Sequence, residues 1–136
     1  MSEAELQKSV ANFIKHYFPF ALFHSDFGSG AKLTPRQAAT QKAQNAGRRA
    51  WPDIFIAEPA PCSASKDEQK EYHGLFVELK REGVRLKKKN GDWATRHIAE
   101  QAEVLKELRK RGYKAEFAVG YGEATRIIDN YFFGGI

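Results

Sequence analysis

The stretch GLFVELKRE, residues 74–82, decides the fold that the sequence predicts. Its first half is rich in Leu, Phe and Val, the residues that favour a buried central β-strand. Glu78 and Lys80 then place two opposite charges in the same strand, and their spacing of two residues puts both side chains on one face. A charge is costly to bury unless it pairs with another charge or binds something. These two side chains are therefore either a salt bridge at a strand end or part of a site.

The segments on either side of this strand predict a small α/β domain with a mixed sheet flanked by helices. Helices are indicated by apolar stripes that begin at capping residues and end near Pro or Gly, and strands by short apolar runs. Residues 58–73 are polar and irregular, and we interpret them as an exposed connection, a long hairpin loop. The predicted order is a helix from Ser2 to Pro19, a strand at 20–26, a polar helix from Thr34 to Gly47, strands at 53–57 and 74–80, a helix from Thr95 to Gly112, a strand at 114–120 and a helix at 123–133.

The composition fits a single domain over residues 1–136. Hydrophobic residues make up 42% of the chain, which is enough for a packed core. No run approaches the ~20 apolar residues of a membrane span, and the N-terminal segment lacks the apolar core of a secretory signal. The single cysteine, Cys62, excludes an internal disulfide and a multi-cysteine zinc site. We therefore expect an intracellular, cytoplasmic protein with no membrane association.

The positive charge is concentrated in two segments of the chain. The formal net charge is +5, and no acidic residue occurs from Phe27 to Pro52. The second segment is the basic flap, residues 81–93 (REGVRLKKKNGDW), with a turn at Asn90-Gly91. Either segment alone is most simply a solvated surface, but two of them beside one charged strand favour contact with a phosphate backbone. The predicted DNA-binding residues are Lys32, Arg36, Arg48, Arg49, Arg81, Arg85, Lys87, Lys88 and Lys89.

Polar residues from four elements are expected to meet near Glu78. Asp53 follows Pro52 at the start of the preceding strand, and strands joined by a hairpin are usually neighbours. Two close carboxylates repel each other and are best tolerated with a divalent cation between them, here Mg²⁺ or Mn²⁺ because no Cys or His takes part. Lys80 could then orient or deprotonate a water nucleophile. Helical phase also places Glu3 and Gln101 on the inward faces of two helices.

Pro52-Asp53 followed by Glu78-Leu79-Lys80 resembles the PD-(D/E)xK nuclease motif, and Glu3 with Gln101 makes the chain similar to the VRR-NUC family. The resemblance implies a restriction-endonuclease-like αβββαβ core with a mixed four-stranded sheet. It implies Asp53, Glu78 and the Leu79 carbonyl as metal ligands, and Lys80, Gln101 and Glu3 as further catalytic residues. Stand-alone members, found in phages and prophages, resemble Holliday junction resolvases and form dimers. We therefore expect a metal-dependent endonuclease and homodimer that acts on branched DNA such as four-way junctions.

The sequence departs from the family pattern at two places and leaves other functions open. Ala50-Trp51 precedes Pro52, where a glycine and a smaller apolar residue are usual, and 20 residues separate Lys80 from Gln101 because of the basic flap. The alternatives are a module that binds DNA junctions without cutting them, an RNA nuclease, and a structural assembly factor. Trp51 and Trp93 are candidates for stacking on bases, although the simpler roles are packing in the core for Trp51 and packing within its loop for Trp93. No Walker or dinucleotide fingerprint is present, so we expect no nucleotide cofactor.

Overall fold

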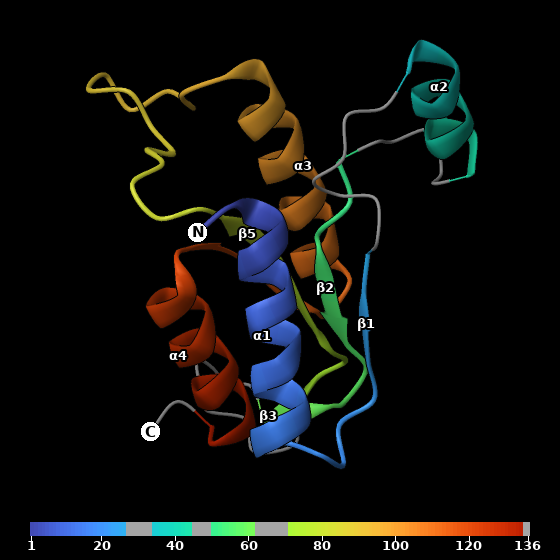
Figure 1. Ribbon diagram of the computed structural model, residues 1–136, viewed down its shortest axis with the longest axis vertical. Coiled ribbons are helices and arrows are strands. Elements are labelled where there is room, and N and C mark those ends of the chain that lie inside the picture. Colours follow the sequence, from blue (N-terminus) through green and yellow to red (C-terminus); the bar gives the residue numbers. More distant parts are fainter. Residues whose placement is uncertain (27–33, 45–49, 62–70, 135–136) are drawn as a thin grey trace.

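The computed structural model of the chain describes residues 1–26, 34–44, 50–61 and 71–134 (Figure 1). Its main elements follow the predicted order, and the connection at 58–73 contains one additional pair of short strands. The helices are α1 (Glu3–Tyr17), α2 (Pro35–Gln44), α3 (Arg96–Lys110) and α4 (Tyr121–Phe132), and the strands are β1 (Phe23–Ser25), β2 (Ile54–Ile56), β3 (Ala60–Pro61), β4 (Glu71–Tyr72), β5 (Leu75–Lys80) and β6 (Lys114–Val119).

The main sheet is mixed and four-stranded, with the order β1-β2-β5-β6. β1 pairs antiparallel with β2, and β2 pairs antiparallel with β5. β5 and β6 are parallel, so the chain must cross over between them, and α3 makes this crossover. The predicted sheet flanked by helices is therefore confirmed, with the GLFVELKRE strand in the interior of the sheet.

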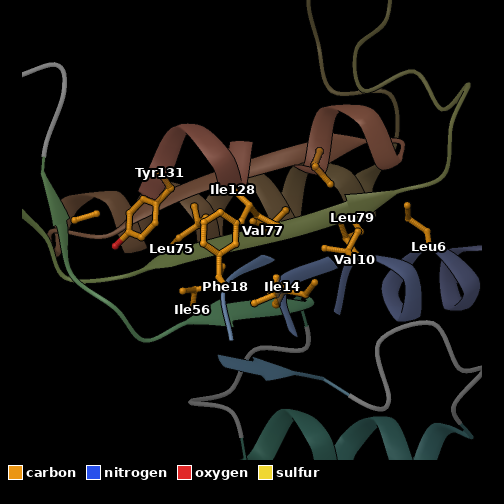
Figure 2. Packing of buried hydrophobic residues seen from close by; sticks show 14 residues of the cluster. Leu6, Val10, Ile14, Phe18, Ile56, Leu75, Val77, Leu79, Ile128 and Tyr131 are labelled. Carbon is orange, nitrogen blue, oxygen red and sulfur yellow. The ribbon is translucent and has the colours of Figure 1, made fainter. Parts of the chain in front are cut away.

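One face of the sheet packs against α1 and α4 to form the larger hydrophobic core (Figure 2). β5 contributes Leu75, Val77 and Leu79 to this core, which are alternate residues and therefore point to the same side. Their partners include Val10 of α1 and Ile128 of α4, both completely buried. This core holds the N-terminal helix and the C-terminal helix side by side on the sheet (Figure 1).

The opposite face of the sheet packs against α3 and forms a second, smaller core. Phe76 of β5 lies there with Val104, Leu105 and Leu108 of α3. Because side chains alternate along a strand, the residues two and four positions after Phe76 share its face. Glu78 and Lys80 are those residues, so the sheet directs both charges toward α3.

The predicted caps define the starts of three helices. Ser2 Oγ accepts a hydrogen bond from the Glu5 N–H (3.1 Å), and Thr95 Oγ1 accepts one from the Ile98 N–H (3.1 Å). Thr34 and Gln37 form the reciprocal pair of a capping box, in which each side chain accepts from the other residue's N–H. α3 ends at the predicted position, with Gly112 at φ +92°.

The first strand and the second helix differ from the sequence prediction. β1 begins at Phe23 rather than residue 20, because the Ala21 N–H bonds to the Phe18 carbonyl (2.9 Å) and closes a turn before the strand. α2 ends at Gln44, and the predicted end at Gly47 lies outside the described residues. Within the described ranges, every helix is too short or too polar to cross a lipid bilayer.

Candidate functional site

Four polar side chains are buried among the described residues, and all four were predicted from the sequence to belong to one site. Asp53, Glu78, Lys80 and Gln101 expose only 7%, 4%, 6% and 5% of their surface, respectively. Other described polar residues lie at least partly at the surface. Burying three charged groups in a chain of this size needs a compensating interaction, because unpaired charges are costly in a protein interior.

The strand register brings Asp53 and Glu78 together. Ile54 of β2 lies opposite Val77 of β5, so extending this register by one residue sets Asp53 opposite Glu78. The charge of Asp53 also acts on the Glu78 carboxyl group. Residues opposite each other in such a pair point to the same side, with Cβ atoms about 4.5–5.5 Å apart. The two carboxylates therefore meet on the α3 face of the sheet, as the sequence predicts.

Asp53 is fixed by hydrogen bonds from both neighbouring strands. Its Oδ2 accepts from the Leu79 backbone N–H (2.7 Å), and its carbonyl accepts from the Asp26 N–H (2.8 Å). Asp26 lies just after β1, and its carbonyl accepts in turn from Gln7 Nε2 of α1 (2.7 Å). Sequence reasoning missed Gln7 and Asp26, because only the strand pairing shows that they support Asp53.

Pro52 offers no backbone donor to the Leu79 carbonyl. Extending the β2–β5 register two positions beyond the Ile54–Val77 pair sets Pro52 opposite Leu79. The Leu79 N–H points toward β2, where it bonds to Asp53, and the carbonyl of the same residue points to the same edge. Proline has no N–H to donate, so the Leu79 carbonyl receives no hydrogen bond from the residue opposite it. The Leu79 carbonyl oxygen therefore points toward β2, the strand that Asp53 precedes.

Glu78 is held by Gln101, and one of its oxygens has no donor in the described structure. Gln101 Nε2 donates to Glu78 Oε1 at 2.8 Å, which joins α3 to β5. Glu78 Oε2 and Gln101 Oε1 are both buried, and neither finds a hydrogen-bond donor among the described residues. A buried acceptor without a donor costs about 1–3 kcal/mol. Two such oxygens at one place fit a site for a cation.

The surroundings of Glu78 favour its protonated form. Burial raises the pKa of Glu78 well above its ordinary value, the nearby charge of Asp53 raises this pKa further, and the charge of Lys80 opposes both effects. Lys80 forms no ion pair with any acid of the described residues. The interpretation of Glu78 and Lys80 as a simple salt bridge is therefore wrong for the described structure.

Glu3 approaches the same site from the other side of the sheet. It begins α1, which covers the face opposite to α3, and its side chain is half-buried. Its charge raises the pKa of Glu78, as the smallest of the contributions. No hydrogen bond or ion pair links Glu3 to the four buried residues in the described structure. Glu3 is thus an outlying charge near the site.

The donor set fits a hard, oxygen-preferring divalent cation better than a softer metal such as zinc or copper. Within the described ranges, no three side chains of His, Cys, Asp and Glu gather as a metal-binding group. The oxygens available are those of the two carboxylates, the Leu79 carbonyl and the Gln101 amide. Mg²⁺ is commonly bound by one or two carboxylates and keeps several water ligands, so this set suits Mg²⁺ or Mn²⁺.

The predicted DNA-binding residues fall on two separate segments. Arg81, Arg85, Lys87, Lys88 and Lys89 are exposed on the basic flap, which follows β5 directly. Arg36 is exposed on α2. Figure 1 shows α2 and the flap projecting at the same end of the molecule, where β5 ends. Lys32, Arg48 and Arg49 lie outside the described residues.

The comparisons with known proteins support the fold. No family model and no curated protein matches the chain. A solved structure described as a VRR_NUC domain protein matches 96% of this chain and 88% of its own length, with a TM-score of 0.64 and 24% sequence identity. Nearly the whole chain therefore has the fold of a VRR_NUC domain protein.

Proposed function

We propose that this protein is a divalent-metal-dependent nuclease of the VRR-NUC type that hydrolyses phosphodiester bonds in DNA. The observation that carries the proposal is the pair of buried carboxylates on adjacent strands, with the unpaired Glu78 Oε2 and Gln101 Oε1 beside them. The fold of a VRR_NUC domain protein supports the same conclusion. Mg²⁺ and Mn²⁺ are the proposed cofactors, and no nucleotide cofactor is needed for this chemistry.

Each buried residue has a distinct part in the proposed reaction. Asp53, Glu78 and the Leu79 carbonyl would hold the ion, which when bound supplies a Lewis acid for a phosphate oxygen and lowers the pKa of a water molecule. Gln101 keeps the Glu78 carboxylate in one orientation through its 2.8 Å hydrogen bond. Lys80 would orient or deprotonate the attacking water, or stabilise the charge that develops on the phosphate.

Branched DNA, such as a four-way junction, is the proposed substrate. The net charge of +5 and the exposed cations on α2 and the flap favour a phosphate backbone over a neutral ligand. A four-way junction has near two-fold symmetry, so a homodimer could place one site on each of two strands. The exposed hydrophobic side chains Tyr17, Phe20, Leu22 and Phe133 lie at or beyond the C-terminal end of α1 and are the proposed contact between two copies. We further propose that the protein works inside the cell, in a bacterium or a phage-infected host.

A cleavage assay on a panel of substrates tests this function. Linear, flapped and four-way DNAs and a matched RNA are incubated with Mg²⁺ or Mn²⁺, beside the Glu78→Ala variant. The proposal expects metal-dependent cutting of branched DNA by the native protein and none by the variant. Binding without cutting would favour the junction-binding module, and cutting of RNA alone would favour the RNA nuclease.

A further inference from the structure

The basic flap is a folded hairpin. The Lys88 N–H bonds to the Asp92 carbonyl and the Ala94 N–H to the Leu86 carbonyl, both at 2.8 Å. The turn is closed by the Gly91 N–H on the Lys88 carbonyl (3.0 Å), and Gly91 has φ +91°, which favours glycine. The flap thus has its shape before any ligand binds.

Trp93 attaches the flap to the strand pair that carries the site. Lys87 and Trp93 form an isolated β-bridge across the hairpin, and Lys87 Nζ lies 4.8 Å from the Trp93 ring centroid. The other side of the attachment is Phe117 of β6, whose ring centroid lies 5.6 Å from that of Trp93. Phe117 is the register partner of Glu78. A continuous set of contacts therefore runs from the flap to the catalytic strand.

The remaining cations of the flap point into solvent. Arg81, Arg85, Lys88 and Lys89 are exposed, and none of them forms an ion pair with an acid of the described residues. Lys87 differs from these four because its ammonium lies over Trp93. The flap therefore presents four cations that form no ion pair among the described residues. The fifth cation, Lys87, packs on Trp93 within the hairpin.

We propose that the basic flap is a preordered phosphate-binding arm and that Trp93 is the positioning residue that holds it in register with Glu78. The inference rests on the proposed nuclease function, and its ligand is the phosphodiester backbone beside the bond that is cut. An arm fixed to β6 would orient the DNA strand as well as attract it. Loss of orientation lowers the rate of the bound complex, whereas loss of charge lowers affinity.

These two effects can be separated by comparing Trp93→Ala with the double variant Lys88→Ala/Lys89→Ala. Binding to a labelled four-way DNA is measured against salt concentration with Ca²⁺ in place of Mg²⁺, and single-turnover cleavage is measured with Mg²⁺ at saturating protein. A hydroxyl-radical footprint locates the bound protein on the DNA. Trp93→Phe is the conservative variant, and Lys15→Ala/Lys106→Ala removes two exposed cations far along α1 and α3.

Trp93→Ala keeps every flap cation, so we expect its affinity and salt dependence to stay near those of the native protein, while its saturated cleavage rate falls about tenfold or more. Trp93→Phe should restore most of that rate. The flap double variant should lose affinity, and its slope of log K against log salt should be shallower by about 2, at roughly 0.9 per lost phosphate contact. The control pair Lys15→Ala/Lys106→Ala should change neither the saturated cleavage rate nor the DNA affinity and its salt slope.

A Trp93→Ala protein that cleaves at the native rate with the native footprint would overturn the inference. So would an equal loss of affinity and salt slope in Trp93→Ala and the flap double variant. If the native protein binds DNA but cuts none of it, the proposed nuclease function fails. The footprint alone then tests whether Trp93 positions the flap on the DNA. A footprint that shifts or shortens in Trp93→Ala then supports the inference, and an unchanged one contradicts it.

Discussion

Gln101 Nε2 donates a hydrogen bond to Glu78 Oε1 at 2.8 Å, and this contact ties the crossover helix α3 to strand β5. It satisfies one oxygen of a carboxylate that is 4% exposed and leaves the other without a donor among the described residues. Gln101 therefore orients Glu78 and does not neutralise it. In the proposed site, this orientation leaves Glu78 Oε2 available to bind the metal.

Gln101→Ala is expected to lower the single-turnover cleavage rate by about 10–100-fold and to raise the Mg²⁺ concentration needed for half-maximal rate, because partners that orient a metal ligand have effects of this size. The measurement is cleavage of a four-way DNA across a Mg²⁺ titration. Glu103→Ala, an exposed position on the same helix, is the matched control. An unchanged Mg²⁺ requirement in Gln101→Ala would show that the hydrogen bond has no part in metal binding.

Glu78→Gln is expected to stabilise the metal-free protein at neutral and higher pH. The folded protein raises the pKa of Glu78 above its ordinary value of 4.5, through burial first and then through Asp53, so the folded state binds more protons than the unfolded state above that pH. The contribution of Glu78 to the free energy of unfolding is therefore present in full at low pH, below its unfolded pKa. This contribution decreases as the pH rises through the pKa of the folded protein. The neutral Gln removes this loss, and the gain is about 1–2 kcal/mol.

Thermal unfolding in EDTA between pH 5 and pH 8 measures this effect. The difference in Tm between Glu78→Gln and the native protein should grow with pH, and saturating Mg²⁺ should stabilise the native protein alone. Glu103→Gln provides the control for an exposed acid. A difference in Tm that is constant across the pH range would contradict the raised pKa of Glu78 in the folded protein.

Lys80→Met is expected to abolish cleavage without weakening metal binding. Methionine keeps much of the buried aliphatic stem but removes the ammonium, and a lost proton-transfer or charge-stabilising group costs about 10²–10⁴-fold in rate. The affinity for Mn²⁺ should stay equal or increase, because a positive charge is removed beside the carboxylates. Calorimetry and single-turnover cleavage on the same preparation measure both quantities, with the exposed Lys106→Met as control. Native cleavage by Lys80→Met would remove Lys80 from the mechanism.

Most of the buried polar cluster could be predicted from the sequence, because local periodicity places Glu78, Lys80 and Gln101 and the adjacency of hairpin strands places Asp53. Alternation along a strand places Glu78 and Lys80 on one face, and helical phase places Gln101 within the apolar stripe of its helix. The structure buries these residues together with Asp53. The number and order of the main strands also followed from local patterns, because the turn and capping signals between them are distinct.

The remaining features depend on long-range packing that local patterns do not contain. Helical phase turns Glu3 inward on α1, but it does not say which face of the sheet α1 covers, and α1 lies opposite to α3. The position of Pro52 opposite Leu79 follows only from the register of β2 with β5. Trp93 was expected to pack within its loop, yet it also packs on Phe117, 24 positions further along the chain.

The central claim is that Asp53 and Glu78 together bind a hard divalent cation, and a calorimetric Mn²⁺ titration of the native protein and Asp53→Asn tests it most directly. The amide oxygen of the substituted side chain could still accept the Leu79 N–H, so the variant removes the charge and keeps the hydrogen bond that fixes the strand end. Asp92→Asn changes an exposed acid of the flap and serves as control. We predict that the native protein and Asp92→Asn bind Mn²⁺ and that Asp53→Asn binds it at least about tenfold more weakly. Absence of Mn²⁺ binding by the native protein, or equal affinity in Asp53→Asn, would contradict the account.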